Sequence, residues 1–275
     1  MSHTPDSLWT RAVGVLLTAP PEDKALAARQ LAADWRAGLL AWPGAAGSGP
    51  SDSLEVPDRP ARPDKPDLLP PRAMKRRGPG SLAGRVALLH ALAHIELNAI
   101  DLACDLLARF PDDEGAALPR AFADDWVRVA DEEGKHFLML QARLKELDAA
   151  YGDLPAHDGL WQAAEATAHD LAARLAIVPL VHEARGLDVT PQTVAALTRA
   201  GDEKSAQILD VIYRDEIGHV AAGVRWFEAA ASRRKVLPKV LFDSLVETHH
   251  TGTLKGPFNE DARAQAGFAQ LMAGT

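Results

Sequence analysis

The sequence has little of what marks a secreted, membrane-spanning or nucleic-acid-binding protein. Among its 275 residues Cys104 is the single cysteine, so no intrachain disulfide can form and a reducing, cytoplasmic compartment is expected. No apolar run approaches the ~20 residues that span a bilayer. The formal net charge of −8 argues against a general nucleic-acid-binding protein. These absences predict a soluble, cytoplasmic protein without a membrane anchor.

Aromatic residues are also scarce, at 5%, whereas alanine and leucine are abundant. Both are among the strongest helix formers, so the composition predicts a helix-rich chain. A chain of this length can form one large domain, or one domain with arms. A domain of that size buries roughly three quarters of the surface that its unfolded chain exposes, so it needs no disulfides for stability.

Proline is unevenly distributed and divides the chain. Residues 1–41 have apolar side chains at helical spacing with a break at Pro20-Pro21, which predicts an N-terminal helical arm. Residues 42–80 contain nine prolines. Proline has no N–H donor and disfavours helical conformation in the residue before it, so an extended strap is expected there. The strap either wraps a folded body or extends freely.

The remaining sequence predicts long helices in a four-helix bundle over residues 81–234, followed by a C-terminal helix and tail over 235–275. Ser81 is a suitable N-cap for the first bundle helix, and Pro119 suits the start of the second. A third helical region is expected over 158–186 with a kink at Pro179, then a break and a short helix over 190–200. The fourth long helix is expected over 202–233.

Glutamate and histidine recur on the apolar faces of these four helices. Glu96 lies in the apolar stripe of the first, where a carboxylate must be neutralised, paired or bound to a metal. The second helix carries Glu133 and His136, whose spacing of three places both on one face. The complete set of predicted metal ligands is Glu96, Glu133, His136, Glu183, Glu216 and His219.

The order Glu, Glu-x-x-His, Glu, Glu-x-x-His on successive helices is the ligand set of ferritin-like carboxylate proteins. With hairpin turns near residues 114 and 201, the four bridging or terminal glutamates lie 18, 19, 18 and 15 positions from their turns, and so at similar depths. Carboxylates with two imidazoles favour iron or manganese. The sequence therefore predicts an all-α, ferritin-like four-helix bundle holding two Fe ions, with Mn as the alternative.

Three other features allow two interpretations each. Glu247 and His250 form a third Glu-x-x-His match, but no glutamate on a preceding long helix accompanies it, which favours a simple helix end. His90 and His94 lie opposite Glu96, which favours contacts with the strap or a subunit partner over a separate metal. Tyr213, three residues before Glu216, is the candidate catalytic residue; the alternative is a core tyrosine with a satisfied hydroxyl.

Several segments resemble an uncharacterised bacterial ferritin-like family, known mainly as a domain of unknown function. The segments are Pro60-Ala-Arg-Pro63, Leu89-His-Ala-Leu-Ala-His-Ile-Glu96, Glu183-Ala-Arg-Gly-Leu-Asp188, Tyr213-Arg-Asp-Glu-Ile-Gly-His-Val220 and Lys255-Gly-Pro-Phe-Asn259. The resemblance covers most of the chain. It implies the ferritin-like fold and a two-metal site on the six residues above, but no settled substrate.

The leading functional hypothesis is an oxygen-activating di-iron oxidase or hydroxylase, whose partners are O2 and a small organic molecule. The first alternative is a non-catalytic iron-binding or metal-sequestering protein. The second is a scaffold that retains the ligands but holds little metal. The sequence leaves open the substrate, the choice between iron and manganese, and whether the chain forms a homo-oligomer.

Overall fold

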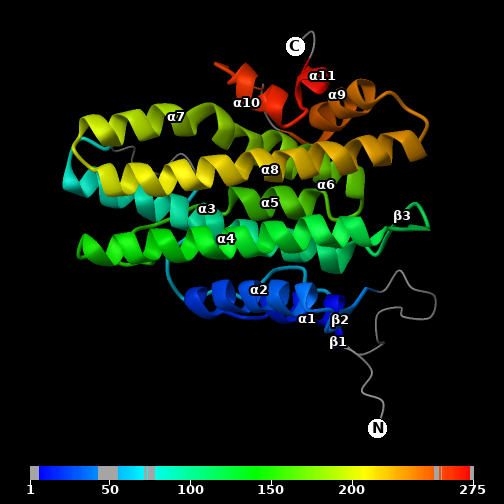
Figure 1. Cartoon of the computed structure of the whole chain (residues 1–275), viewed down its shortest axis with the longest axis horizontal. Coiled ribbons are helices and arrows are strands. Elements are labelled where there is room, and N and C mark those ends of the chain that lie inside the picture. Colours follow the sequence, from blue (N-terminus) through cyan, green and yellow to red (C-terminus); the bar gives the residue numbers. More distant parts are fainter. Residues whose placement is uncertain are drawn as a thin grey trace. The chain divides into compact units, whose positions relative to one another are not determined.

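The computed structural model describes residues 6–42, 55–70, 73, 78–250, 254 and 256–272. The described chain is all-α apart from short two-residue strands, as predicted (Figure 1). It divides into two compact units. Unit 1 contains residues 1–75 and 89–158, and unit 2 contains residues 76–88 and 159–275. The long helix α3 (Leu82–Arg109) belongs to both units, with its residues from Leu89 onward in unit 1.

Unit 1 begins with the predicted N-terminal helical arm. Helices α1 (Leu8–Leu16) and α2 (Pro21–Arg36) are separated at Pro20-Pro21, because proline is well tolerated in the first turn of a helix but disrupts the hydrogen bonding of its interior. Strands β1 (Asp6–Ser7) and β2 (Leu40–Ala41) pair in parallel and join the two ends of the arm. Helix α2 packs along α4 (Arg120–Glu146), as Figure 1 shows.

A tight hairpin links α3 and α4 at the turn predicted near residue 114. Its strands β3 (Asp112–Asp113) and β4 (Ala116–Ala117) are antiparallel, with Glu114 and Gly115 between them at positive φ. At the start of α3 the Ser81 hydroxyl accepts a hydrogen bond from the Gly84 N–H at 3.1 Å, which confirms the predicted N-cap.

The described part of the strap, residues 55–70, wraps unit 1. The Ala61 N–H donates to the Leu16 carbonyl at 2.8 Å, and the Arg62 guanidinium donates to the Asn98 amide oxygen of α3 at 2.7 Å. Leu68 forms a parallel bridge with Ala156. These contacts decide between the two interpretations left open by the sequence for this part of the strap; residues 43–54, 71, 72 and 74–77 lie outside the described residues.

Unit 2 is built around the antiparallel pair α7 and α8, which lie side by side in Figure 1. The Asp202 carboxylate caps α8 by accepting from the Ser205 N–H at 3.1 Å, directly after Gly201 at φ 74°. The helices of this unit are α5 (Gly159–Ala166), α6 (Leu171–Ile177), the π-helix η2 (Val178–Glu183), α7 (Ala184–Arg199), α8 (Glu203–Arg233), α9 (Pro238–His249), α10 (Glu260–Gln265) and α11 (Ala269–Met272).

The predicted third helical region is more divided than expected. Its first part is separated into α5 and α6, because the Asp170 side chain caps a new helix by accepting from the Ala172 and Ala173 N–H groups. The disturbance expected at Pro179 takes the form of a π-helix, in which the i→i+5 pattern accommodates an extra residue. The third region therefore reaches Glu183 through two helices and a π-turn.

The break predicted between residues 186 and 190 is wrong. Helix α7 continues from Ala184 to Arg199 through Pro191. A proline within a helix leaves the carbonyl four residues earlier without its N–H partner. That carbonyl belongs to Leu187, and it accepts a hydrogen bond from the Asn259 side chain at 3.1 Å instead. A donor 72 positions away in the sequence thus allows the helix to continue.

The C-terminal region contains more helix than the predicted single helix and tail. Helix α9 ends at His249 with His250 as its C-cap, so the interpretation of Glu247-x-x-His250 as a helix end is confirmed. Helices α10 and α11 follow, and α10 packs on α7 and α8. Among the described helices, α3 is long and apolar enough to cross a membrane, but 67% of its apolar stretch is buried, as in core helices of soluble proteins.

Candidate metal centre

Three of the predicted ligands, Glu96, Glu133 and His136, come together inside unit 1, and we call them the first half-site. Glu96 projects from α3, and the other two project from α4. The His136 Nδ1 atom lies 3.2 Å from Glu96 Oε2 and 3.5 Å from Glu133 Oε2. One ligand atom from each residue lies within 4.8 Å of the others, and all three side chains are buried. This is a compact, carboxylate-rich donor set.

The electrostatics of the first half-site favour a bound cation. Burial raises the pKa of Glu96 well above its usual range, the nearby Glu133 carboxylate raises it further, and His136 only partly opposes both effects. Two buried carboxylates this close cannot both be ionised without a compensating positive charge. In the absence of a cation the pair therefore retains a proton, which a metal ion would displace.

A glycine next to Glu133 allows the N-terminal arm to pack directly behind the first half-site. A Cβ atom on Gly134 would lie 2.8 Å from the Ala25 carbonyl oxygen of α2 and 3.1 Å from the Arg29 side chain. Both distances are shorter than van der Waals contact, so only glycine permits this approach. The close packing of α2 fixes the part of α4 that carries Glu133 and His136.

The other three predicted ligands, Glu183, Glu216 and His219, lie in unit 2, and we call them the second half-site. His219 is fully buried, and its Nδ1 atom lies 3.5 Å from Glu216 Oε2. The Glu216 Oε2 atom is buried and has no hydrogen-bond partner among the described residues. Glu183 is half-buried and ends η2, which packs against α8.

The π-helix requires a glycine on the facing helix. A Cβ atom on Gly223 of α8 would lie 2.7 Å from Pro179 Cβ and 3.3 Å from a methyl group of Leu180. The proline ring is rigid and cannot move aside. Gly223 therefore allows η2 to lie close to α8, and so fixes the position of Glu183 at the end of the π-turn.

The candidate catalytic residue Tyr213 has a hydrogen-bond partner in the C-terminal region. Its hydroxyl accepts from the Asn259 side-chain amide at 3.0 Å. Asn259 and two buried residues, Asp188 and Arg263, form a polar cluster that the sequence patterns did not indicate. The one signal available was Pro191, which leaves a helical carbonyl in need of another donor. A catalytic role for Tyr213 stays a prediction.

His90 and His94 hold a loop rather than the strap. The Gly152 N–H donates to His90 Nε2 at 2.9 Å. The His94 Nε2–H donates to the His157 carbonyl at 3.0 Å, which leaves Nδ1 to accept from the Tyr151 hydroxyl at 2.8 Å. Burial lowers the pKa of His94 to about 4, so the imidazole is neutral at physiological pH.

The strap contacts that were expected at these histidines occur one turn further along α3. Arg62 binds Asn98 there, and its guanidinium also pairs with the buried Asp101 carboxylate at 2.6 Å. Asp101 pairs in addition with the buried Lys24 of α2. The strap is basic at this position, so it binds the acidic and amide side chains of α3. The imidazoles of His90 and His94 bind the loop instead.

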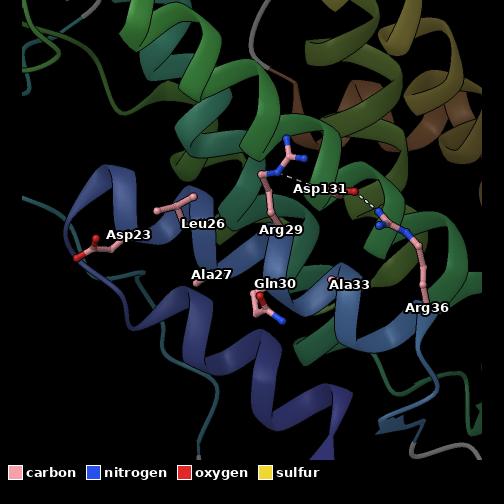
Figure 2. A pocket seen from close by; sticks show the side chains of 8 residues that line it. All are labelled: Asp23, Leu26, Ala27, Arg29, Gln30, Ala33, Arg36 and Asp131. Atoms are coloured by element: carbon pink, nitrogen blue, oxygen red, sulfur yellow. Dashed lines mark hydrogen bonds and ion pairs between the residues drawn. The ribbon is translucent and has the colours of Figure 1, made fainter.

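A surface cavity of about 640 Å³ lies along the exposed side of α2 (Figure 2). Figure 2 shows Arg29 and Arg36 reaching Asp131 of α4 from two sides, in agreement with the ion pairs that both form with its carboxylate. None of the six predicted ligands lines this cavity. It is therefore a feature of the arm surface and not a substrate pocket of the predicted site.

Comparison with known proteins supports the assignment of a family without a described activity. A family model with the description "Protein of unknown function (DUF455)" matches residues 17–273. An "Uncharacterized protein" of Haemophilus influenzae is 44% identical over 214 residues, which cover 76% of this chain and 74% of that protein. No solved structure matches the chain.

Proposed function

The chain belongs to the DUF455 family of unknown function, and we propose that it is a ferritin-like protein whose two half-sites together bind two metal ions. The ions would be iron, with manganese as the alternative. We further propose that the loaded protein activates oxygen as an oxidase or hydroxylase of a small organic substrate. The ligands would be the six glutamate and histidine residues of the two half-sites.

The observation that carries this proposal is the buried cluster of Glu96, Glu133 and His136. An apolar interior does not accommodate two carboxylates without compensation, and no lysine or arginine is hydrogen-bonded to Glu96 among the described residues. A divalent cation would supply the missing charge. Carboxylate oxygens with imidazole nitrogens fit iron or manganese better than the softer ions that prefer thiolates.

The second half-site supports the same proposal independently. Glu216 presents a buried carboxylate oxygen that lacks a hydrogen-bond partner among the described residues, and His219 lies beside it on the same face of α8. Buried polar atoms in native proteins are nearly always satisfied, so an orphaned oxygen next to an imidazole is a feature expected of a metal-binding site.

Two ferrous ions would supply the electrons that reduce oxygen. The protein's own contribution would be a site with little access to water. Glu96, Glu133 and His136 are all buried. A buried site of this kind would keep an oxidant from reacting with solvent before it meets the substrate.

An anaerobic titration of the metal-free protein with Fe(II), followed by mixing with oxygen, tests the proposal. We expect saturation at two ions per chain, then rapid oxidation of the iron with uptake of oxygen in a fixed ratio, recorded by near-UV and visible absorption. Stoichiometric binding without an oxygen response would favour the non-catalytic metal-binding alternative. Absence of stoichiometric binding of either Fe(II) or Mn(II) would overturn the metal centre itself.

A further inference from the structure

Helix α7 depends on a hydrogen bond from outside itself. Pro191 has no N–H group, so the Leu187 carbonyl one turn earlier cannot form its usual helical hydrogen bond. The Asn259 Nδ2 group donates to that carbonyl at 3.1 Å. The side chain of Asn259 thus takes the place of the missing backbone donor in α7.

The same amide group of Asn259 also reaches helix α8. Its Nδ2 atom donates a second hydrogen bond, to the Tyr213 hydroxyl at 3.0 Å. Its Oδ1 atom accepts from the Ala262 N–H at 3.2 Å and so caps α10. Both amide hydrogens and the amide oxygen are therefore used, and one side chain joins α7, α8 and the C-terminal segment, residues 256–272.

A buried ion pair holds the C-terminal segment in place beside this amide. The Arg263 guanidinium donates to both oxygens of Asp188, at 2.9 and 2.8 Å, and the Asn259 backbone N–H donates to Asp188 Oδ1 at 3.0 Å. Burial raises the pKa of Asp188, but these donors outweigh burial and bring the pKa below its usual value. The guanidinium also stacks over Phe258 and Phe268, 4.7 and 5.0 Å from the ring centroids.

These contacts occur one helical turn from the carboxylates of the second half-site. Leu187 follows Glu183 by four residues, and Tyr213 precedes Glu216 by three, so each is the same-face neighbour of a predicted ligand. A change in the spacing of α7 and α8 at Asn259 would therefore move the two carboxylates relative to each other. The polar cluster is placed to prevent that movement.

We propose that Asn259 is a positioning residue, which fixes the spacing and register of α7 and α8 and thereby holds Glu183 and Glu216 in their metal-binding arrangement. The inference rests on the proposed two-metal function. If Asn259 has this role, the second half-site is complete only when the C-terminal segment is docked on α7 and α8. Pro191 creates this dependence, because it removes the backbone donor that would make α7 independent of Asn259.

The test compares the full-length protein with Asn259→Ser and with the double variant Pro191→Ala/Asn259→Ser. Serine is as good an N-cap as asparagine, so α10 keeps its cap. The serine side chain is, however, too short to reach the Leu187 carbonyl and the Tyr213 hydroxyl. We expect Asn259→Ser to weaken Fe(II) and Mn(II) binding about 10-fold, the lower end of the range for residues that orient ligands. Pro191→Ala restores an N–H donor to the Leu187 carbonyl and should recover part of this loss.

Arg234→Gln is the matched control. Arg234 binds both oxygens of Asp170 at 2.8 and 2.9 Å in the same unit, but it lies 18 residues beyond Glu216. It should lower stability without weakening metal binding. An equal loss of metal affinity in this control, unchanged affinity in Asn259→Ser, or no recovery in the double variant would overturn the positioning role.

Hydrogen exchange of the metal-free protein separates this inference from the proposed function. Asn259→Ser should accelerate amide exchange near residues 184–191 and 209–216, and Pro191→Ala should reverse the acceleration in α7. Unchanged exchange would overturn the inference even if the wild-type protein binds two metal ions. Faster exchange in a protein that binds no metal would support the link between α7 and α8 while overturning the metal centre.

Discussion

The two half-sites contain the same residue types, two glutamates and one histidine, but the chain holds them in different ways. The first lies on the uninterrupted helices α3 and α4, and its three side chains are buried. The second combines α8 with a π-turn, and its glutamates are half-buried. On a regular helix the spacing of the residues sets which face the ligands share, whereas in the π-turn the position of Glu183 also depends on contacts that hold the irregular segment in place. In unit 2 that support comes from Gly223 and Asn259.

Removal of one carboxylate from either half-site should have the largest effect. Glu133→Ala and Glu216→Ala should each reduce loading from two metal ions per chain to one or none, because a bridging or terminal ligand is lost. The loss of affinity should exceed the roughly 100-fold upper range for residues that only orient ligands. Anaerobic titration with metal analysis measures it. Glu132→Ala, next to Glu133 but ion-paired with Arg128 at 3.1 Å, is the control; full loading in both half-site variants would contradict the metal centre.

The two close-packed glycines should show the next largest effect. Gly134→Ala and Gly223→Ala each place a methyl group within 2.8 Å of a rigid neighbour, Ala25 O or Pro179 Cβ. Overpacking of this kind typically lowers the free energy of unfolding by about 1–3 kcal/mol. Urea unfolding measures the loss in stability. Gly223→Ala should also weaken metal binding, since η2 carries Glu183; unchanged stability in either variant would show that the helices are not held this closely.

Replacing the ionisable side chain of Glu96 by a neutral one should stabilise the metal-free protein by a moderate amount. The native state keeps a proton on the pair because the pKa of Glu96 is raised, whereas the unfolded chain releases it near the usual value of 4.5. The native state then binds more protons, so the free energy of unfolding of the metal-free protein should fall as pH rises above about 5.

Glu96→Gln should remove that pH dependence and raise stability at pH 7.5 by about 1 kcal/mol, while it abolishes metal loading. Thermal unfolding of metal-free samples between pH 5 and 8 tests this. The half-exposed Glu22 offers a control position, since Glu22→Gln leaves the buried carboxylates in place. If the stability of Glu96→Gln depended on pH in the same way as that of the wild type, the pair of Glu96 and Glu133 would not be protonated in the metal-free state.

The smallest effect concerns the continuity of α7 beside the second half-site. Gly186 lies within this helix, and a Cβ atom there would meet nothing within 4 Å. Gly186→Ala should therefore raise the free energy of unfolding by about 0.5–1 kcal/mol, as expected for an open helical position. Gly14→Ala in α1 has the same open surroundings and should behave alike. Destabilisation by Gly186→Ala alone would favour the chain break that the sequence pattern predicted.

Local sequence signals located most of the helices and the candidate ligands. Ser81 and Pro119 mark the starts of α3 and α4, because capping and first-turn proline are properties of neighbouring residues. Glu133 with His136, and Glu216 with His219, could be identified because a spacing of three fixes a shared helical face. These predictions needed no knowledge of contacts between distant segments.

The sequence by itself determined the all-α class, the helices that carry the six glutamates and histidines, and the extended character of the strap. Only the tertiary structure decided that α7 continues through Pro191, that the described strap wraps unit 1, and that His90 and His94 hold a loop. Each of these outcomes depends on a hydrogen-bond partner far along the chain, as Leu187 depends on Asn259. Helix propensity and apolar periodicity are properties of neighbouring residues, whereas the satisfaction of a buried carbonyl or imidazole depends on which distant segment packs against it.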